Sequence, residues 1–509
     1  MSVNALLFVE LMSSLHPPIR SAGAYRIASE IRKAGYTCQV VDYFTKFSED
    51  EIKKIMQAYI GPDTLIIGFS STFFEKIDSP KSNLPFIRNL ETRTRNYPYD
   101  EEKMEEWFKE IYSINPDVKI VLGGANSAGL HGPGDAFAIG YCDQAIVEYM
   151  NFIDGKNPFF QYEKVNDNQL AFYGSHFTNK FDFSSSTIQW DSTDHLQHAE
   201  TVPIEIGRGC IFSCSFCNAP NRGKKKLEDV KKASVLRDEF LRNYNEFGIT
   251  RYTYADDTHN DSIEKLEMLH RVVTSLPFQI EYGAYLRHDL INAHKETAAL
   301  LLESGLRGAY FGIESLNHRT SRSIGKGLHP EKTKELMHWL REDVWKNEVG
   351  IMAGFIVGLP YDSPESVSDW SAWLLSPSCP LHSVEINPLN LPSIKSGIRS
   401  NFEIAVNDGK YGYTIDQDGN WKNEFFTKAT AVELVTKLVI TRNKMKKFGF
   451  GGFLPVLLSN VGFEPKEIIN IENTNELWSL VYQRRELYLN KYKVSLMDAV
   501  TKIINIDCH

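Results

Sequence analysis

The chain has 509 residues, of which 42% are hydrophobic and 24% are charged, and its formal net charge at pH 7 is −9. These near-average values exclude a mainly disordered, collagen-like or disulfide-dense protein. The acidic balance argues against a basic surface over the whole molecule, so nucleic acid is retained as a partner only through a local basic groove.

The N-terminal residues and the cysteine content indicate a cytoplasmic protein. The first apolar run lacks a preceding basic segment and is interrupted by Glu10, so we expect a first strand and not a signal peptide. No run of about 18 uncharged apolar residues occurs, and no membrane span is expected. Seven cysteines in this length do not suggest a secreted disulfide scaffold.

Residues 1–155 alternate between strand and helix signals. This alternation predicts an α/β domain with a Rossmann-like, doubly wound parallel sheet. The strand-like runs are 5–11, 64–72 and 118–124, and the helical periods are 21–35 and 100–113.

The remainder of the chain separates into three parts. Residues 156–200 are rich in Asn, Asp and Ser and are predicted to be a linker. Residues 201–392 hold about six strand-then-helix units, which predict a partial (β/α)6 barrel. Residues 393–509 are predicted to form a mainly helical C-terminal domain, with a hairpin-like segment at 412–422.

The strongest chemical signal is a group of three cysteines, Cys210, Cys214 and Cys217, spaced C-x3-C-x2-C. Three thiolates on one loop can each bind one iron of a cubane cluster, and the fourth iron then has no protein ligand. Two alternatives are zinc with a remote fourth ligand and cysteines without any metal. Zinc sites more often pair C-x2-C knuckles, and no second knuckle is present.

The cysteine loop, with Phe216 before its last cysteine, resembles that of the radical S-adenosylmethionine (SAM) enzymes. The resemblance covers about residues 200–390. It implies that a [4Fe-4S] cluster binds SAM at its open iron and that an external donor of the flavodoxin or ferredoxin type supplies one electron. SAM cleavage then gives an adenosyl radical that takes hydrogen from the substrate. Further matches are YADD (254–257), YLRHD (285–289), FGIES (311–315), IGKG (324–327) and GFIVGLP (354–360).

The resemblance also implies roles for individual residues. The three cysteines would ligate the cluster, and Phe216 would lie by the adenine. Asp256 and Asp257 stand where the family binds the methionine ammonium, although the glycine-glycine-glutamate form often seen there is lacking. Glu314 and Ser315 would meet the ribose hydroxyls. Arg287 would meet the SAM carboxylate or a substrate anion.

Each of these residues has a structural alternative. Asp256 and Asp257 could cap a helix, as could Glu314 and Ser315. Arg287 could form a structural ion pair. Lys326, between two glycines, is expected to be a solvated loop residue. Gly354, Gly358 and Pro360 are expected to shape a turn after a strand.

The N-terminal domain resembles the cobalamin-binding domain of the B12-dependent radical SAM class. Its strand-end loops include Leu15 to Pro18, and open α/β sheets bind ligands at that edge. The D-x-H-x-x-G pattern that supplies a histidine to cobalt is absent. The alternative is a domain kept for structure or substrate contact. Small residues that would admit cobalamin closely are Ser70, Ser71, Gly123 and Gly124.

These observations favour a cobalamin-dependent radical SAM enzyme that transfers a methyl group to an unactivated carbon of a small-molecule or natural-product-like substrate. The first alternative is rearrangement or oxidation without methyl transfer. The second is a non-catalytic regulator that binds metal or cobalamin. No catalytic acid or base is identified from the sequence.

Overall fold

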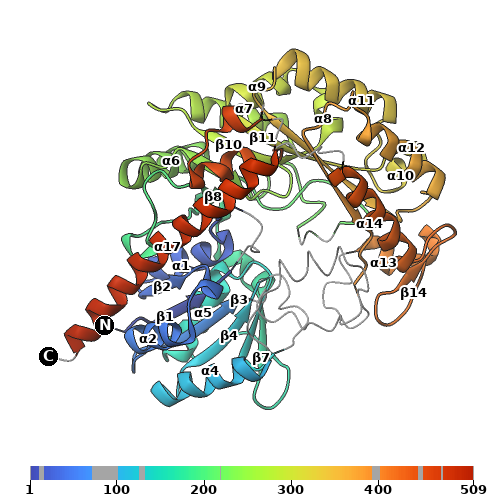
Figure 1. Ribbon diagram of the computed structural model, residues 1–509. Helices are drawn as coiled ribbons and strands as arrows, with labels where there is room; N and C mark the ends of the chain where they lie inside the picture. The colour runs from blue at the N-terminus through green and yellow to red at the C-terminus, as the bar shows by residue number, and fades with distance from the viewer. Residues whose placement is uncertain are drawn as a thin grey trace. The chain divides into compact units, whose positions relative to one another are not determined.

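The computed structural model describes residues 2–10, 17–70, 101–124, 132–217, 219, 221–392, 402–444, 451–469, 471 and 474–507 (Figure 1). The chain divides into two compact units. Unit 1 comprises Met1–His198 with Arg485–His509, and unit 2 comprises Ala199–Arg484. Each unit is built on one large sheet.

The sheet of unit 1 has the strand order β2-β1-β3-β4-β5-β7-β6, and every neighbouring pair except β6–β7 is parallel. The order β2-β1-β3-β4-β5 is that of a doubly wound sheet, in which the chain reverses direction between β1 and β3. The strands are β1 (Ala5–Phe8), β2 (Cys38–Val41), β3 (Ile66–Ser70), β4 (Lys119–Gly123), β5 (Ala136–Ile139), β6 (Glu163–Lys164) and β7 (Leu170–Tyr173).

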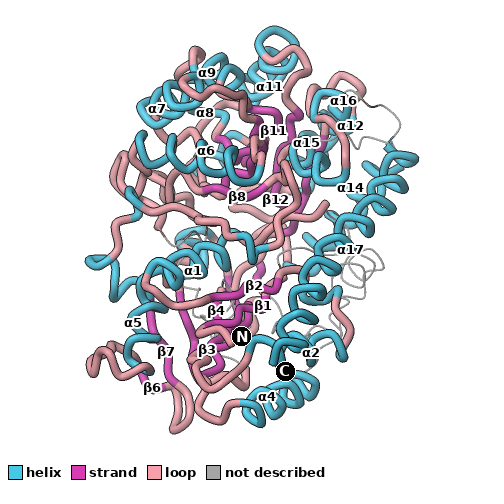
Figure 2. The backbone as a smooth tube through the Cα atoms, turned by 90° about the vertical axis from the view of Figure 1, so that its left-hand side faces the viewer, coloured by secondary structure: helices cyan, strands magenta, loops and turns pink. Residues whose placement is uncertain are grey.

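Helices cover both faces of this sheet (Figure 2). On one face, a buried ion pair of 3.2 Å joins Arg26 of α1 to Asp143 of α5. On the other, an ion pair of 3.8 Å joins Lys53 of α2 to Glu110 of α4. The predicted doubly wound fold is therefore confirmed. The helices are α1 (Ala22–Lys33), α2 (Glu49–Tyr59), α4 (Glu101–Ile114) and α5 (Asp143–Ile153).

The segment 156–200 differs from the linker that the sequence predicts, because part of it extends the first sheet. Strand β7 pairs in parallel with β5, and Ala171 and Phe172 are fully buried. Further along, Asp194 accepts hydrogen bonds from Arg32 at 2.6 and 2.9 Å. A four-residue strand among Asn and Asp residues carries little periodicity, so only its pairing with β5 identifies it.

The sheet of unit 2 has the order β13-β12-β11-β10-β9-β8, and all its pairs are parallel. Helices connect successive strands, so the predicted partial (β/α)6 barrel is confirmed (Figure 1). The elements are β8 (Val202–Ile204), α6 (Ala233–Phe247), β9 (Arg251–Tyr254), α7 (Ile263–Thr274), β10 (Glu281–Leu286), α8 (His288–Ala293), α9 (Thr297–Glu303), β11 (Leu306–Glu314), α10 (His318–Ser323), α11 (Pro330–Trp339), β12 (Gly350–Val357), α12 (Pro364–Leu375) and β13 (Ser383–Pro388).

Local sequence explains where the barrel elements begin and end. Ser363 caps α12 by accepting the backbone N–H of Ser366, and Pro364 occupies the first helical position. Gly248 ends α6 in the left-handed conformation, with φ of 69°. Most barrel-strand residues are buried, as expected for parallel strands covered on both faces.

The C-terminal part of the chain is mainly helical, as predicted. A short hairpin places Trp421 against Gly358, where a Cβ atom would overlap the indole ring. Inside the barrel, a Cβ atom on Gly308 would overlap the carbonyl oxygen of Gly452, so this strand position requires glycine. The elements are α13 (Glu403–Val406), β14 (Thr414–Ile415), β15 (Trp421–Lys422), α14 (Lys428–Lys444), α15 (Leu454–Leu457), α16 (Pro465–Ile469) and α17 (Thr474–Asp507).

The last helix, α17, contributes to both units. Its residues from 485 onward pack within unit 1, where the backbone N–H of Asp42 donates to the Tyr492 hydroxyl at 2.9 Å and Lys493 pairs with Glu51 at 2.7 Å. No helix in the part of the chain that the structure describes is long and apolar enough to cross a membrane.

Candidate functional site

The three predicted cysteine ligands lie on one tightly held loop after β8, which we define as the cysteine loop, residues 205–224. Within it, the N–H of Cys210 donates to the Asn221 carbonyl at 3.1 Å, and the N–H of Gly223 donates to the Cys210 carbonyl at 2.7 Å. Gly209 has φ of 72°, and a Cβ atom there would overlap Asn221. The glycine before the first cysteine is therefore required by the turn.

Each of the three cysteine sulfurs accepts a hydrogen bond from an N–H group. The backbone N–H of Phe212 lies 3.5 Å from Cys210 Sγ, and that of Ala219 lies 3.4 Å from Cys217 Sγ. Arg287 Nη1 lies 3.2 Å from Cys214 Sγ. Such donors stabilise thiolates, and hydrogen bonds to sulfur are one way in which proteins tune iron–sulfur clusters. The loop therefore fits a cluster held by three thiolates.

The surroundings of Cys217 act on its thiol in opposite directions. Burial raises the pKa of Cys217, the hydrogen bond from the Ala219 N–H lowers it, and the neighbouring Cys214, Asp257 and Cys210 raise it. Within the described ranges, no group of three or more His, Cys, Asp or Glu side chains is arranged to hold a metal ion. The fit to a multi-iron cluster therefore depends on the spacing of the loop and on its N–H donors.

Arg287, just after β10, connects the cysteine loop to two other segments. Its guanidinium donates to both oxygens of Asp289, at 3.0 and 2.6 Å, and to the carbonyl of Gly325 at 2.9 Å. It also lies 3.8 Å from the ring centre of Phe212. The structural ion pair considered from the sequence is therefore present. Contact with the SAM carboxylate or a substrate anion stays a prediction, and the observed contacts of Arg287 join Cys214 to Asp289 and Gly325.

Asp256 is fully enclosed beneath the cysteine loop. It accepts the backbone N–H of Ile206 at 2.8 Å and pairs with Lys265 at 3.2 Å, while Lys265 also pairs with Asp261 at 2.8 Å. Burial alone would raise the pKa of Asp256, but Lys265, His259 and the Ile206 N–H together hold it well below its usual range. These contacts give Asp256 a structural role, and its predicted contact with the SAM ammonium is not tested.

Asp257, the next residue, is exposed beside the cysteines. Although the residue reaches solvent, the protein around its carboxyl group partly desolvates it; this desolvation and the charge of Asp256 raise its pKa, while a hydrogen bond from the backbone N–H of Gly209 lowers it. Helix α7 is capped by Ser262, so neither aspartate is the helix cap considered from the sequence. Asp257 is therefore the better placed of the two to meet a cationic group.

Glu314 lies at an irregularity in β11 and has φ of 70°, an uncommon value for a residue other than glycine. Its carboxylate lies 3.6 Å from Lys326, and burial raises its pKa while Lys326 lowers it. Ser315 donates to Asp362 at 3.2 Å. Asn317 caps α10, so Glu314 and Ser315 do not.

The expectation for Lys326 is wrong: it is only 8% exposed. It belongs to the IGKG turn, residues 324–327, whose Ile324 carbonyl accepts the N–H of Ser215 at 3.4 Å. Lys326 Nζ also lies 5.9 Å from the ring centre of Phe216. The signal available in the sequence was the pair of glycines that flank Lys326. In the structure both have positive φ and form a tight turn, not a solvated loop. Tyr310 of β11 and Glu385 of β13, two strands that flank β12 in the sheet, were also missed.

The predicted cobalamin contacts that are described lie at one edge of unit 1. Ser70 and Gly123 are in register at the carboxyl ends of β3 and β4, and Gly124 has φ of 108°. Ser71 and the residues from Leu15 to His16 lie outside the described residues. Contact with cobalamin stays a prediction.

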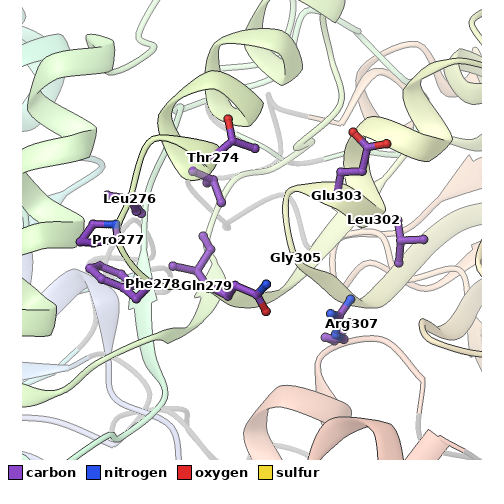
Figure 3. Close-up of a pocket in the computed structure, with 11 residues that line it drawn as sticks. Thr274, Leu276, Pro277, Phe278, Gln279, Leu302, Glu303, Gly305 and Arg307 are labelled. Carbon is purple, nitrogen blue, oxygen red and sulfur yellow. The ribbon is translucent and has the colours of Figure 1, made fainter.

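A hollow of about 530 Å³ occurs elsewhere in unit 2 (Figure 3). It lies at the amino ends of β10 and β11, whereas the cysteine loop and Arg287 follow the carboxyl ends of β8 and β10. We therefore do not include it in the candidate site. Its lining includes Phe278, Gln279, Glu303 and Arg307.

The chain is similar to several known proteins. Residues 204–374 match the model of the Radical SAM superfamily. An uncharacterized methyltransferase of Pyrococcus horikoshii is 26% identical over 172 residues, which are 33% of this chain and 36% of the relative. The anaerobic magnesium-protoporphyrin IX monomethyl ester cyclase of Cereibacter sphaeroides is 26% identical over 186 residues, which are 36% of this chain and 29% of the relative. The matches thus span about a third of these curated relatives.

Two solved structures share the fold over nearly the whole chain. The methyltransferase TsrM from Kitasatospora setae, with cobalamin and a [4Fe-4S] cluster bound, has a TM-score of 0.63 at 16% identity, covering 97% of this chain and 100% of TsrM. The cobalamin-dependent enzyme OxsB, with aqua-cobalamin and SAM bound, has a TM-score of 0.57 at 11% identity, covering 99% and 81%. At these identities the likeness shows the fold alone.

Proposed function

We propose, from the match of residues 204–374 to the Radical SAM superfamily, that the chain is a cobalamin-dependent radical SAM methyltransferase acting on an unactivated carbon of a small molecule. The observation that carries the proposal is the cysteine loop, where three sulfurs each accept an N–H hydrogen bond. The doubly wound fold of unit 1 and the likeness to TsrM and OxsB support the cobalamin part.

We assign the following roles to residues of this chain. Cys210, Cys214 and Cys217 would hold the cluster, and Arg287 would keep Cys214 in place. Asp257 and Glu314 would bind the ammonium and ribose groups of SAM. With these groups bound, the cluster supplies one electron from a flavodoxin- or ferredoxin-type donor, and cobalamin supplies a carrier for the methyl group.

Anaerobic reconstitution tests the cluster. The protein should bind about four irons and four sulfides per chain, and replacing all three cysteines with alanine should abolish that binding. A matched control is Cys379→Ala, because Cys379 is buried in unit 2 and lies outside the cysteine loop. One tightly bound zinc and no iron would contradict the proposal.

The reaction type is tested with the reduced, reconstituted protein and added cobalamin. Methyl transfer predicts S-adenosylhomocysteine among the products and cobalamin bound to the protein, seen by its absorption spectrum. Replacing Gly124 with Leu should block cobalamin binding sterically, because Gly124 follows the carboxyl end of β4, and should leave the cluster intact, because the cysteine loop belongs to unit 2.

A second candidate is oxidation or cyclisation without methyl transfer, which the match to the Cereibacter cyclase favours. It predicts 5′-deoxyadenosine without S-adenosylhomocysteine.

A further inference from the structure

Two neighbouring glycines make room for large polar side chains on the inner face of the barrel. Gly312 of β11 is in register with Gly354 of β12, which is in register with Glu385 of β13. A Cβ atom on Gly312 would overlap the Glu314 carboxylate, and one on Gly354 would overlap the Tyr310 hydroxyl. The side chains of Glu314 and Tyr310 therefore lie flat across the sheet.

Tyr310 crosses Gly354 to reach Glu385. Its hydroxyl donates to Glu385 Oε2 at 2.8 Å, and Asn387 Nδ2 donates to Glu385 Oε1 at 3.0 Å. Each carboxylate oxygen thus has one neutral donor. A carboxylate oxygen can accept more than one hydrogen bond, so Glu385 retains capacity for another donor.

The two carboxylates on this face of the sheet, Glu314 and Glu385, differ in their charged partners. Glu314 is paired with Lys326 at 3.6 Å. No Lys, Arg or His in the described ranges forms an ion pair with Glu385, although it is only partly exposed. Glu385 affects two neighbouring groups. Burial is the largest cause that raises the pKa of Tyr310 and Glu385 is the second largest, and Glu385 also raises the pKa of Glu314.

Aromatic rings stand next to this uncompensated carboxylate. Tyr285 of β10 is 43% exposed, and its ring centre lies 4.9 Å from that of Tyr310 and 4.7 Å from that of Phe453. An anionic group beside electron-rich ring faces favours a cation with apolar surface, because the faces attract positive charge.

Glu314, Tyr310 and Glu385 lie next to the residues assigned to the cofactors. Lys326, which pairs with Glu314, follows Gly325, whose carbonyl accepts from Arg287 beside Cys214. A molecule held by Glu385 would therefore lie on the same face as Glu314, where the reacting carbon of a substrate must be brought.

We propose that Glu385, oriented by Tyr310 and Asn387, binds the protonated amine of the substrate, with Tyr285 against its aromatic or apolar part. The substrate class is then an arylalkylamine or a related amine cation. This inference rests on the proposed radical SAM function, which it deepens.

The test compares two probes that share a ring and differ in charge, tryptamine and indole-3-propionate. Binding to the anaerobically reconstituted protein is measured by calorimetry. Tryptamine should bind at least 10-fold more tightly than the anion. Glu385→Gln should reduce tryptamine affinity at least 10-fold, and Tyr310→Phe should reduce it several-fold because Glu385 loses one of its two donors. The control is Glu246→Gln, an exposed glutamate of α6, which should change nothing.

Equal binding of the two probes, no tryptamine binding at millimolar concentration, or unchanged affinity in Glu385→Gln would each overturn the proposal. Iron content and SAM binding are measured on the same samples. If both are normal and the amine preference is missing, this inference alone fails. If the cluster is missing, the radical SAM proposal fails, and the effect of Glu385→Gln on tryptamine still decides whether Glu385 binds amines.

Discussion

Replacing Lys265 with methionine tests whether Asp256 is a buried structural anion or a ligand for SAM. Lys265 is 1% exposed and is the shared cation of two buried carboxylates, Asp256 at 3.2 Å and Asp261 at 2.8 Å. Methionine has a similar length and no charge. The substitution therefore removes the cation and leaves Asp256 with the Ile206 N–H and the neighbouring His259.

The expected loss of stability is large. Two unit charges 3.2 Å apart interact with about 5 kcal/mol at an effective dielectric constant of about 20, and removing one partner of a buried ion pair typically costs about 3–5 kcal/mol. We expect a loss in that range for Lys265→Met. The double variant Asp256→Asn/Lys265→Met should regain part of it, because the stranded charge is then absent as well.

Urea unfolding, followed by the tryptophan fluorescence to which the buried Trp345 of unit 2 contributes, measures this loss. With a slope of roughly 3 kcal/mol per molar urea, the midpoint for unit 2 should fall by about 1 M or more. The control is Lys226→Met, which breaks an exposed pair with Glu264 on the same helix as Lys265 and should have little effect. A Lys265→Met midpoint within error of the wild type would refute the structural role. Asp256→Asn that abolishes SAM binding at unchanged stability would restore the ligand role.

Two further predictions concern Arg287 and Asp362. Arg287→Lys keeps the charge, but an ammonium cannot contact Cys214, Asp289 and Gly325 together. Losing a hydrogen bond of about 1 kcal/mol to Cys214 should lower the reduction potential of the cluster by roughly 40 mV. An unchanged potential in a redox titration would contradict this prediction. Burial raises the pKa of Asp362 to about 7, against hydrogen bonds from Ser366, Ser315 and Thr320 that lower it. Between pH 4 and 7 the folded state then binds more protons than the unfolded state, so this group makes stability fall as pH rises. Asp362→Asn should flatten that fall in unfolding midpoints measured from pH 5 to 8, and an unaltered profile would argue against it.

The sequence was sufficient for features that depend on neighbouring residues. Alternating strand and helix periods over 1–155 and 201–392 predicted both parallel sheets, because the pattern of buried positions is local to each element. The spacing of Cys210, Cys214 and Cys217 placed the proposed cluster ligands on one loop, and the glycine at 209 was part of the same local turn.

Tertiary structure decided everything that depends on which distant residues meet. The contact of Arg287 with Cys214 joins segments 73 residues apart, and the bond from Tyr310 to Glu385 joins strands 75 residues apart. The partners of Asp256 and Lys326 likewise depend on how the strands align in the sheet. Register between strands sets which side chains share a face, and no local periodicity encodes it for strands buried on both sides. The sequence therefore predicted the chemistry of the cysteine loop, while only the fold revealed the contacts of Glu385 and of the residues that hold the loop.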